Sequence, residues 1–511
     1  MIGAEVVVRT LDRCGVDVCF ANPGTSEMHF LSALDSAPDM RSVLVLQENV
    51  ATGAADGFAR ISGRPAATLL HLGPGLANGL SNLHNASRAL SPVVNIVGDH
   101  ATGHHRLDAP LTSDIRSLSE TVSVSTRCVM PGRGIGAETA AAVSDSLGPV
   151  PGVATMLLPA DAAWLEAPDD IGSLPVSRAE APEVDHGWIA QALRQPGAVL
   201  MLGHDAVRGE PLRIAGRIAA ATGAALMAQT TNPVTDRGAG RVALERLPFN
   251  PDQARQRLAG ASVVVLAGAR APVAFFAYPG KPGRLTAPDT TVIELCPPEV
   301  TASAPLSALA EACGAAGDPV VQSPRLPDLL TGALDAAKVG AVLARHLPEG
   351  AIVVDEAMTN GVPIAAATAA AAPHRWCQNM GGSIGYGAPL ATGCAAADPT
   401  VPVVALIGDG SAMYTIQALW TQARENQNVT TIILANRSYR ILQAEVAKMD
   451  PTQRSNAMDD MLRIDAPVLD FVAMAQGMGV AGDRVSTAEE LDRVLRDAFF
   501  QPGPRLIEVA L

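Results

Sequence analysis

The sequence Gly-Asp-Gly at 408–410 places a carboxylate between two glycines, directly after the apolar segment 403–407. A second apolar segment, 430–434, is followed by Asn436. If the two segments are neighbouring parallel strands, Asp409 and Asn436 lie together at the carboxyl edge of a sheet, where ligands of open α/β sheets bind. Carboxylate and amide oxygens suit a Mg²⁺ ion that also binds phosphate oxygens. The spacing therefore predicts a Mg²⁺ and phosphate site, with the acid held in a tight turn.

Two further residues stand where a strand-like segment ends. Glu48 follows the segment 42–46 and begins a helical pattern, so it either complements the helix dipole or transfers protons. His71 ends the segment 66–71 and either caps the next helix or acts beside a reacting group. Residue type and position leave both alternatives open for each side chain.

The elements that would carry these residues alternate between strand and helix. We expect a parallel sheet with helices on both faces, because such alternation is typical of βαβ units. The expected strands are 16–20, 42–46, 66–71, 93–98, 198–202, 263–267, 291–295, 352–354, 403–407, 430–434 and 505–509. One crossover helix is expected after the Gly-Asp-Gly sequence, with Ile416, Leu419, Trp420 and Ala423 on its apolar face.

Two Pro-containing stretches, 167–185 and 317–328, interrupt this alternation and have the composition of linkers. We therefore predict an α/β protein of three doubly wound parallel-sheet domains. Their expected bounds are 1–166, 186–316 and 329–511.

Composition limits the possible partners and the compartment. A hydrophobic content of 48% with a net charge of −14 describes a well-buried globular protein and argues against nucleic acid or an anionic membrane as partner. The seven cysteines are scattered, which favours free thiols in a reducing, cytoplasmic environment and leaves a catalytic thiol as an alternative. We expect neither a signal peptide nor a membrane span, because the first helical pattern contains charges and no apolar run approaches about 18 residues.

From Asp409 to Asn436 the sequence resembles the thiamine-diphosphate-dependent enzymes of the acetolactate synthase, benzoylformate decarboxylase and pyruvate oxidase type. The family signature ends in two asparagines, and here the first of them is Ala435. The resemblance covers the whole chain and implies a pyrimidine-binding domain, a central domain and a diphosphate-binding domain. It implies that Mg²⁺ is held by Asp409, Asn436 and the backbone oxygen of Ser438, and that the cofactor also contacts Gly408, Gly410 and Ser411.

The same resemblance implies the groups that serve the reactive end of thiamine diphosphate. Glu48 matches the acid that protonates N1′ of the aminopyrimidine. In "NMGGSIGYGAP", Gly382 matches the backbone carbonyl that accepts the 4′-amino group, and Ile384 matches the apolar wedge between the two rings. In "VDEAMTNG", Thr359 and Asn360 are candidates to bind phosphate.

"NPGTSEMHFL" and "LLHLGPGLANGLSNL" resemble benzoylformate decarboxylase, which implies substrate contact by Thr25 and an active-site role for His71. The second histidine of that enzyme would fall near Ala277 and is absent, so we expect a different specificity. Leu442 stands where pyruvate and indolepyruvate decarboxylases carry a glutamate, which argues against that branch.

Three polar residues beside these motifs have open roles. Arg440 could pair with a substrate carboxylate or point outward. His104 and His105 could contact substrate or lie in a solvated loop, and they have no evident partner set for a metal ion.

The resemblance implies decarboxylation of a small 2-oxo acid, with release of an aldehyde or carboligation to a 2-hydroxy ketone. It also implies a homodimer or homotetramer with active sites at the subunit interface. FAD is undetermined, so a flavin-containing oxidase of the pyruvate oxidase type is an alternative. A non-catalytic regulatory relative is another, although it would be expected to lack Glu48.

Overall fold

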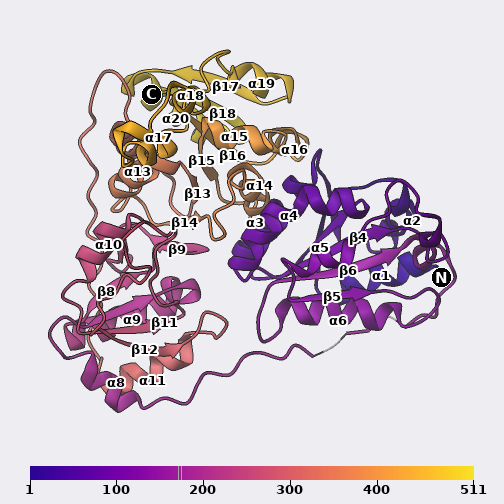
Figure 1. Ribbon diagram of the computed structural model, residues 1–511, viewed down its shortest axis with the longest axis horizontal. Helices are drawn as coiled ribbons and strands as arrows, with labels where there is room; N and C mark the ends of the chain where they lie inside the picture. Colours follow the sequence, from indigo (N-terminus) through magenta and orange to yellow (C-terminus); the bar gives the residue numbers. More distant parts are fainter. Residues whose placement is uncertain (171, 174) are drawn as a thin grey trace. The chain divides into compact units, whose positions relative to one another are not determined.

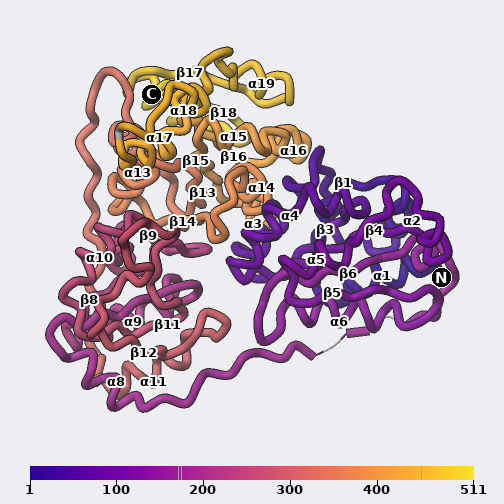
Figure 2. Tube along the Cα trace, in the orientation of Figure 1, coloured from indigo at the N-terminus to yellow at the C-terminus, as the bar shows by residue number. Residues whose placement is uncertain are grey.

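The computed structural model describes residues 1–170, 172–173 and 175–511. Ile171 and Leu174 belong to the predicted linker 167–185 and lie outside the described residues. The chain forms two compact units, whose course can be followed in Figure 2. Unit 1 comprises Met1–Ser177, Leu326–Thr368 and Gly381–Leu511, and unit 2 comprises Arg178–Arg325 and Ala369–Met380.

The first part of unit 1 contains a parallel sheet with the strand order β2-β1-β3-β4-β6-β5. Strands β3, β4 and β6 are buried along their whole length, as expected for a parallel sheet covered on both faces. Helices α1 and α6 pack against one another, and so do α3 and α4 (Figure 1). The strands are β1 Val18–Asn22, β2 Arg41–Leu44, β3 Ala66–Leu70, β4 Val93–Asp99, β5 Ser125–Cys128 and β6 Val153–Pro159, and the helices are α1 Gly3–Arg13, α3 Glu48–Ser62, α4 Leu72–Arg88, α5 Ile115–Glu120 and α6 Ile135–Leu147.

The second part of unit 1 contains strands β17, β18, β16, β15 and β13, which are parallel neighbours in that order. Their carboxyl ends therefore meet at one edge, where the predicted metal ligands lie. The strands are β13 Ile352–Glu356, β15 Val403–Gly408, β16 Val429–Ala435, β17 Ala481–Val485 and β18 Arg505–Ala510, and the helices include α12 Ala336–His346, α14 Gly387–Ala397, α15 Asp409–Thr415, α16 Ala418–Arg424 and α20 Ala488–Phe500.

Helices α3 and α14 join the two parts of unit 1 (Figure 1). Their contact depends on glycine, because a Cβ at Gly393 would overlap the backbone carbonyl of Ala54 and a Cβ at Gly57 would overlap that of Leu390. The small residues that are abundant in this sequence therefore let two helices pack backbone to backbone.

Unit 2 contains a separate parallel sheet with the strand order β10-β8-β7-β11-β12. Strand β12 lies at its edge, where Glu294 is exposed between buried Ile293 and Leu295. The elements are β7 Val199–Leu202, β8 Ala225–Ala228, β10 Glu245–Arg246, β11 Val263–Ala267, β12 Thr291–Cys296, α9 Gly209–Thr222, α10 Pro251–Leu258 and α11 Ser303–Cys313, with an antiparallel pair of β9 Val234–Arg237 and β14 His374–Gln378.

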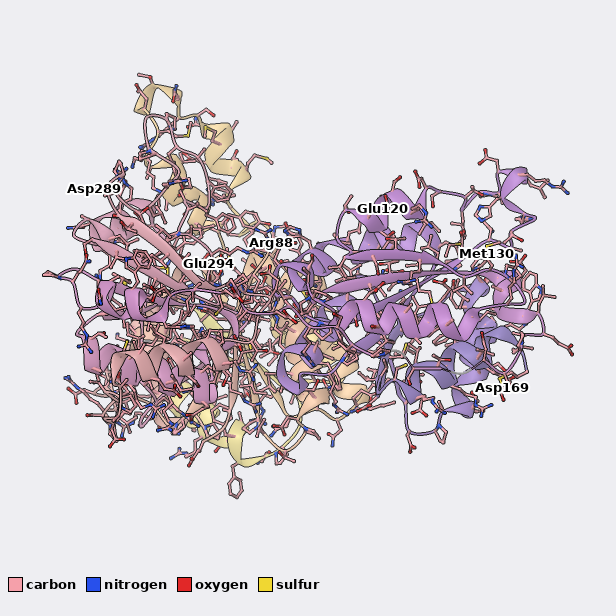
Figure 3. The ribbon with its side chains drawn as sticks, turned by 90° about the horizontal axis from the view of Figure 1, so that it is seen from below. Arg88, Glu120, Met130, Asp169, Asp289 and Glu294 are labelled. Atoms are coloured by element: carbon pink, nitrogen blue, oxygen red, sulfur yellow. The ribbon has the colours of Figure 1, made fainter. Side chains whose placement is uncertain are left out.

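These sheets confirm the predicted fold class of doubly wound parallel α/β domains. None of the helices in the described residues is long and apolar enough to cross a membrane. Figure 3 shows acidic side chains at the surface of both units, including Glu120, Asp169, Asp289 and Glu294. All seven cysteines are free thiols, as expected.

Candidate active site

The predicted metal ligands lie at the ends of two adjacent strands. β15 and β16 are parallel neighbours, with Gly408 opposite Leu434, so Asp409 and Asn436 follow directly at the same edge. The tight turn expected at 408–410 is wrong, because Asp409 is the first residue of α15. The single crossover helix is also wrong, since it is divided into α15 and α16 with a break at Ile416 and Gln417.

Backbone hydrogen bonds hold the oxygens of these ligands in place. The N–H of Gly410 donates to Asp409 Oδ1 at 2.9 Å, and the N–H of Arg437 donates to Asp409 Oδ2 at 2.5 Å. Asn436 Oδ1 accepts the Ser438 N–H at 3.1 Å. Burial raises the pKa of Asp409, while these N–H groups and the Arg440 guanidinium lower it. A cation bound here would stabilise the charged carboxylate further.

The two glycines around Asp409 have different surroundings. A Cβ at Gly410 would lie 2.5 Å from the Tyr439 ring, so this glycine is required by packing within the protein. A Cβ at Gly408 would meet nothing closer than Met358 Cγ at 3.6 Å. This is an ordinary contact distance, so packing within the protein does not require a glycine at 408, and its lack of a Cβ suits the close approach of a phosphate group. Ser411, two residues after Asp409 in α15, is buried.

The phosphate candidates Thr359 and Asn360 lie in a 3₁₀ turn, Met358–Asn360, that follows β13. Asn360 is buried and Thr359 is half-buried. Met358 has a backbone φ of +52°, which is uncommon for residues other than glycine. Since β13 is the neighbour of β15, this turn lies at the same sheet edge as Asp409.

Glu48 begins α3, and its side chain is 9% exposed. Asn78 Nδ2, on α4, donates to Glu48 Oε2 at 3.1 Å. A Cβ at Gly75 would lie 3.5 Å from both Glu48 Oε1 and His71 Cβ. The structure therefore brings Glu48 and His71 together on either side of the first turn of α4.

Glu27 pairs directly with His71, a contact that sequence reasoning missed. Its Oε2 lies 2.8 Å from His71 Nδ1 and accepts the Gly24 N–H at 2.7 Å. Glu27 is 2% exposed, and burial raises its pKa although His71 and Gly24 lower it. Gly24 and Gly98 make room for the pair, since a Cβ at either would overlap it. With Nδ1–H donating to Glu27, the imidazole keeps Nε2 available to a reacting group.

The predicted substrate residues are more exposed. Thr25 is exposed at the start of the turn that carries Glu27, and Arg440 is exposed at the start of α17, Arg440–Val446. His105 Nε2 lies 3.2 Å from Asp99 Oδ2. His104 lies in the same loop, and no cluster of three His, Cys, Asp or Glu in the described part of the chain could hold a metal ion.

The loop that contains Ala277 carries aromatic side chains in unit 2. Phe275 and Phe276 are 52% and 58% exposed, with ring centroids 4.8 Å apart. The loop itself, residues 270–284, contains no histidine.

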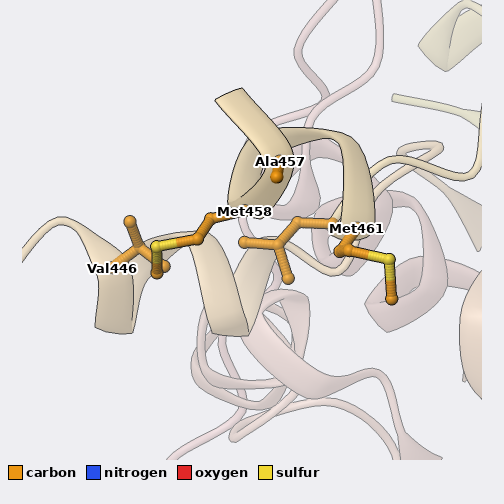
Figure 4. Close-up of a pocket in the computed structure, with 5 residues that line it drawn as sticks. Val446, Ala457, Met458 and Met461 are labelled. Carbon is orange, nitrogen blue, oxygen red and sulfur yellow. The ribbon is translucent and has the colours of Figure 1, made fainter. Parts of the chain in front are cut away.

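An apolar pocket of about 360 Å³ lies between α17 and α18, Asn456–Met461 (Figure 4). The loop 436–439, which carries the predicted metal ligands Asn436 and Ser438 and is called the metal loop, directly precedes α17. The Tyr439 N–H donates to the Leu462 carbonyl at 2.9 Å and links the pocket wall to the metal loop. Its lining offers no polar group for chemistry, and consists of Val446, Ala457, Met458, Met461 and Leu462.

Comparison with protein families gives two matches. The family model for the thiamine pyrophosphate enzyme N-terminal TPP binding domain matches residues 1–118, and that for the C-terminal TPP binding domain matches residues 358–509. A relative from Mycobacterium tuberculosis, named "Putative acetolactate synthase large subunit IlvX", is 48% identical over 100% of this chain and 99% of its own length. The chain belongs to the thiamine pyrophosphate enzymes. In this thiamine pyrophosphate enzyme, Glu48 and His71 lie in the region matched by the N-terminal family model. Asp409 and Asn436 lie in the region matched by the C-terminal model.

Further relatives of this thiamine pyrophosphate enzyme are decarboxylases. Benzoylformate decarboxylase of Pseudomonas aeruginosa is 29% identical over 98% of this chain and 97% of its own length. The solved thiamine diphosphate-dependent 4-hydroxybenzoylformate decarboxylase of Rhodococcus jostii RHA1 is 26% identical, with a TM-score of 0.85 over 100% of this chain and 99% of the other. These similarities confirm the predicted family and the predicted class of enzyme, a thiamine-diphosphate-dependent enzyme of the decarboxylase and acetolactate synthase-like type.

Proposed function

We propose that this enzyme decarboxylates a small 2-oxo acid and then releases an aldehyde or joins the product to a second carbonyl as a 2-hydroxy ketone. The observation that carries the proposal is Glu48, a buried carboxyl group held by Asn78 beside His71. Thiamine diphosphate, when bound, supplies an electron sink for loss of CO₂. In this proposal the chain holds and moves the protons, with Glu48 at the aminopyrimidine N1′.

His71 is proposed to serve the substrate end of the site. Glu27 holds Nδ1, so Nε2 can donate to the substrate carboxylate or exchange a proton with the product. Thr25, His105 and Arg440 are proposed to contribute to substrate binding. The absence of a histidine at Ala277 supports a specificity different from that of benzoylformate decarboxylase.

We propose that Mg²⁺ binds Asp409, Asn436 and the backbone oxygen of Ser438. The donors fit this ion, because all three are hard oxygens and two of them are held in place by backbone N–H groups. The diphosphate would lie against Gly408, Gly410, Ser411, Thr359 and Asn360, and the ring end against Gly382 and Ile384.

We also propose three domains with the bounds 1–166, 186–316 and 329–511, and a homodimer or homotetramer whose subunits share active sites. The free thiols support a cytoplasmic location. FAD stays open, and a yellow purified protein with flavin absorbance would favour the oxidase alternative.

The test is a panel of 2-oxo acids, aromatic and aliphatic, incubated with enzyme, thiamine diphosphate and Mg²⁺. CO₂, aldehyde and hydroxy ketone are measured separately, because their ratio distinguishes simple decarboxylation from carboligation. Turnover of at least one acid, abolished by Glu48→Gln, is expected. If no acid in the panel releases CO₂, the proposal is wrong and the non-catalytic alternative is favoured.

A further inference from the structure

The loop from Gly381 to Gly387 joins β14 to α14 and carries both Gly382 and Ile384. Gly382 and Gly385 have φ +82° and +87°, a conformation that favours glycine. Because glycine is so permissive, these angles do not by themselves determine one loop shape. Contacts from outside the loop are required to select it.

Glu356, the last residue of β13, provides such contacts from the sheet side. Its Oε1 accepts the Gly385 N–H at 2.5 Å and the Tyr386 N–H at 3.4 Å, and its Oε2 accepts the Gly387 N–H at 2.7 Å. The side chain is 2% exposed. Three consecutive amides of the loop thus converge on one buried carboxyl group, which also caps the start of α14.

Two nearby hydroxyl groups add hydrogen bonds to those that Glu356 makes with the loop. Thr415 Oγ1 donates to the Gly385 carbonyl at 2.8 Å, and the Tyr386 hydroxyl donates to the Asp355 carbonyl. Both the N–H and the C=O of Gly385 are therefore held.

Helix α4, from the first part of unit 1, holds the loop from the other side. Asn85 pairs with Ser383 in both directions, since Asn85 Nδ2 donates to the Ser383 carbonyl at 2.9 Å and the Ser383 N–H donates to Asn85 Oδ1 at 3.2 Å. Asn85 Nδ2 also donates to Asn82 Oδ1 at 2.9 Å, and Asn82 Nδ2 donates to the Gly385 carbonyl at 3.4 Å. The two asparagines are buried, so the bonds are shielded from water.

We propose that Glu356 and Asn85 are positioning residues, which hold the Gly381–Gly387 loop from two sides in the conformation that presents the Gly382 carbonyl and the Ile384 side chain to the cofactor. Neither residue is assigned to the reacting atoms. Ile384, half-buried, lies between the residues held by Asn85 and Glu356. The inference rests on the proposed function, because that proposal places thiamine diphosphate against this loop.

The test compares full-length wild-type enzyme with Glu356→Gln, Asn85→Ala and the double variant. Glu356→Gln keeps the shape of the side chain but turns an amide group toward backbone N–H donors. Two matched controls alter buried polar groups elsewhere in the same part of unit 1. Glu508→Gln on β18 replaces a buried carboxyl group by an amide, and Gln427→Ala removes an amide whose Nε2 donates to the Thr392 carbonyl on α14 at 2.9 Å.

Three quantities are measured for each protein. The dissociation constant of thiamine diphosphate with Mg²⁺ is obtained by calorimetry, the rate of hydrogen exchange at C2 of the bound cofactor by quenched NMR in D₂O, and the melting temperature of the cofactor-free protein by circular dichroism. C2 exchange needs no substrate, so it reports on the placement of the two rings alone.

We expect each loop variant to slow C2 exchange by about tenfold or more, since small displacements at a reacting centre have such effects. The double variant should be slowed by less than the product of the two single effects, because both act through one loop. The controls should lower the melting temperature without slowing C2 exchange.

Wild-type exchange rates in both loop variants would overturn the inference, as would equal slowing in the controls at equal loss of stability. If Glu356→Gln does not fold, Asn85→Ala alone decides between these outcomes from the other side of the loop. Failure of the wild-type protein to bind thiamine diphosphate would instead overturn the proposed function, and this inference with it.

Discussion

At the scale of single residues, Glu48 has the most direct predicted effect. Glu48→Gln keeps the hydrogen bond with Asn78 possible but removes the exchangeable proton, so we expect kcat to fall by about 10²-fold or more. The melting temperature should stay close to that of wild-type enzyme. The measurement is CO₂ release from the best 2-oxo acid of the panel, with exposed Glu294→Gln as the control, and an unchanged kcat would contradict the role of Glu48.

The proposed role of Asp409 as a metal ligand predicts that the affinity for thiamine diphosphate depends on a divalent cation. Asp409→Asn removes the charge of the proposed ligand set, so the apparent affinity for thiamine diphosphate should fall by about tenfold or more. Removing Mg²⁺ from wild-type enzyme with EDTA should have the same effect, and adding Mg²⁺ should reverse it. Calorimetry with and without the metal checks both expectations. Equal cofactor affinity in EDTA and in Mg²⁺ would rule out the proposed metal site.

Glu356 predicts a dependence of stability on pH. Burial raises its pKa from 4.5 to about 7, although the N–H groups of Gly385 and Gly387 lower it. Between these values the folded protein binds this proton more tightly than the unfolded chain, so the group lowers the free energy of unfolding as pH rises from 4.5 to 7. The loss amounts to at most about 3 kcal/mol.

Urea unfolding of cofactor-free wild-type and Glu356→Gln protein at several pH values between 5 and 8 measures this effect. The variant should show a flatter dependence on pH, and the difference between the two curves isolates Glu356 from the other acids. Two parallel curves would contradict the raised pKa.

Spacing was sufficient to single out Asp409 and Asn436, whereas Glu48 and His71 were singled out by the resemblance to the family. Glu27 and Glu356 were missed for a physical reason, since their roles come from burial against groups that are distant in the chain. Each nevertheless left a local signal: Glu27 is an acid in a short turn, and Glu356 is an acid at the end of an apolar strand. Whether the predicted residues act as proposed stays a prediction.

At the scale of elements, the buried central strands were predictable and the edges were less so. Strands such as β3 and β15 were expected within one residue of their ends, because short apolar runs that follow a proline indicate buried parallel strands. β5 and β17 carry polar residues on a solvent-facing edge and give no such signal. The break between α15 and α16 was also missed, since its apolar face continues across the break.

At the contact between α3 and α14, we expect an added side-chain atom at Gly393 to lower the stability of the protein. A Cβ there would overlap the Ala54 carbonyl, so Gly393→Ala should destabilise the protein by about 1–3 kcal/mol in spite of the better helix propensity of alanine. Gly477→Ala, at the end of α19, Phe471–Gly477, is the control because a Cβ there meets nothing within 4 Å. Thermal unfolding of both variants measures the difference. Equal stabilities would show that the helices can separate without cost.

At the scale of the whole molecule, the proposed sharing of active sites between subunits can be tested by mixing variants. No described hydrogen bond or ion pair joins Glu48 to Asp409 within one chain. If a site takes Glu48 from one subunit and Asp409 from its partner, a mixed dimer of Glu48→Gln and Asp409→Asn chains contains one intact site. Random co-assembly should then recover about a quarter of wild-type activity, although each variant alone is inactive. No recovery in purified mixed dimers would place each site within one chain.

The contact of α3 with α14 also has a consequence for how the protein is made. Cys394 on α14 donates to the carbonyl of Gly57 on α3, and the two are 337 positions apart in the chain. At synthesis rates of about 5–20 residues per second, the nascent first part waits on the order of tens of seconds for its partner helix. During that interval the face of α3 that carries Gly57 lacks the helix that covers it in the folded protein. Pausing or truncation between the two helices should therefore yield aggregation-prone fragments, whereas slower synthesis after residue 397 should have little effect.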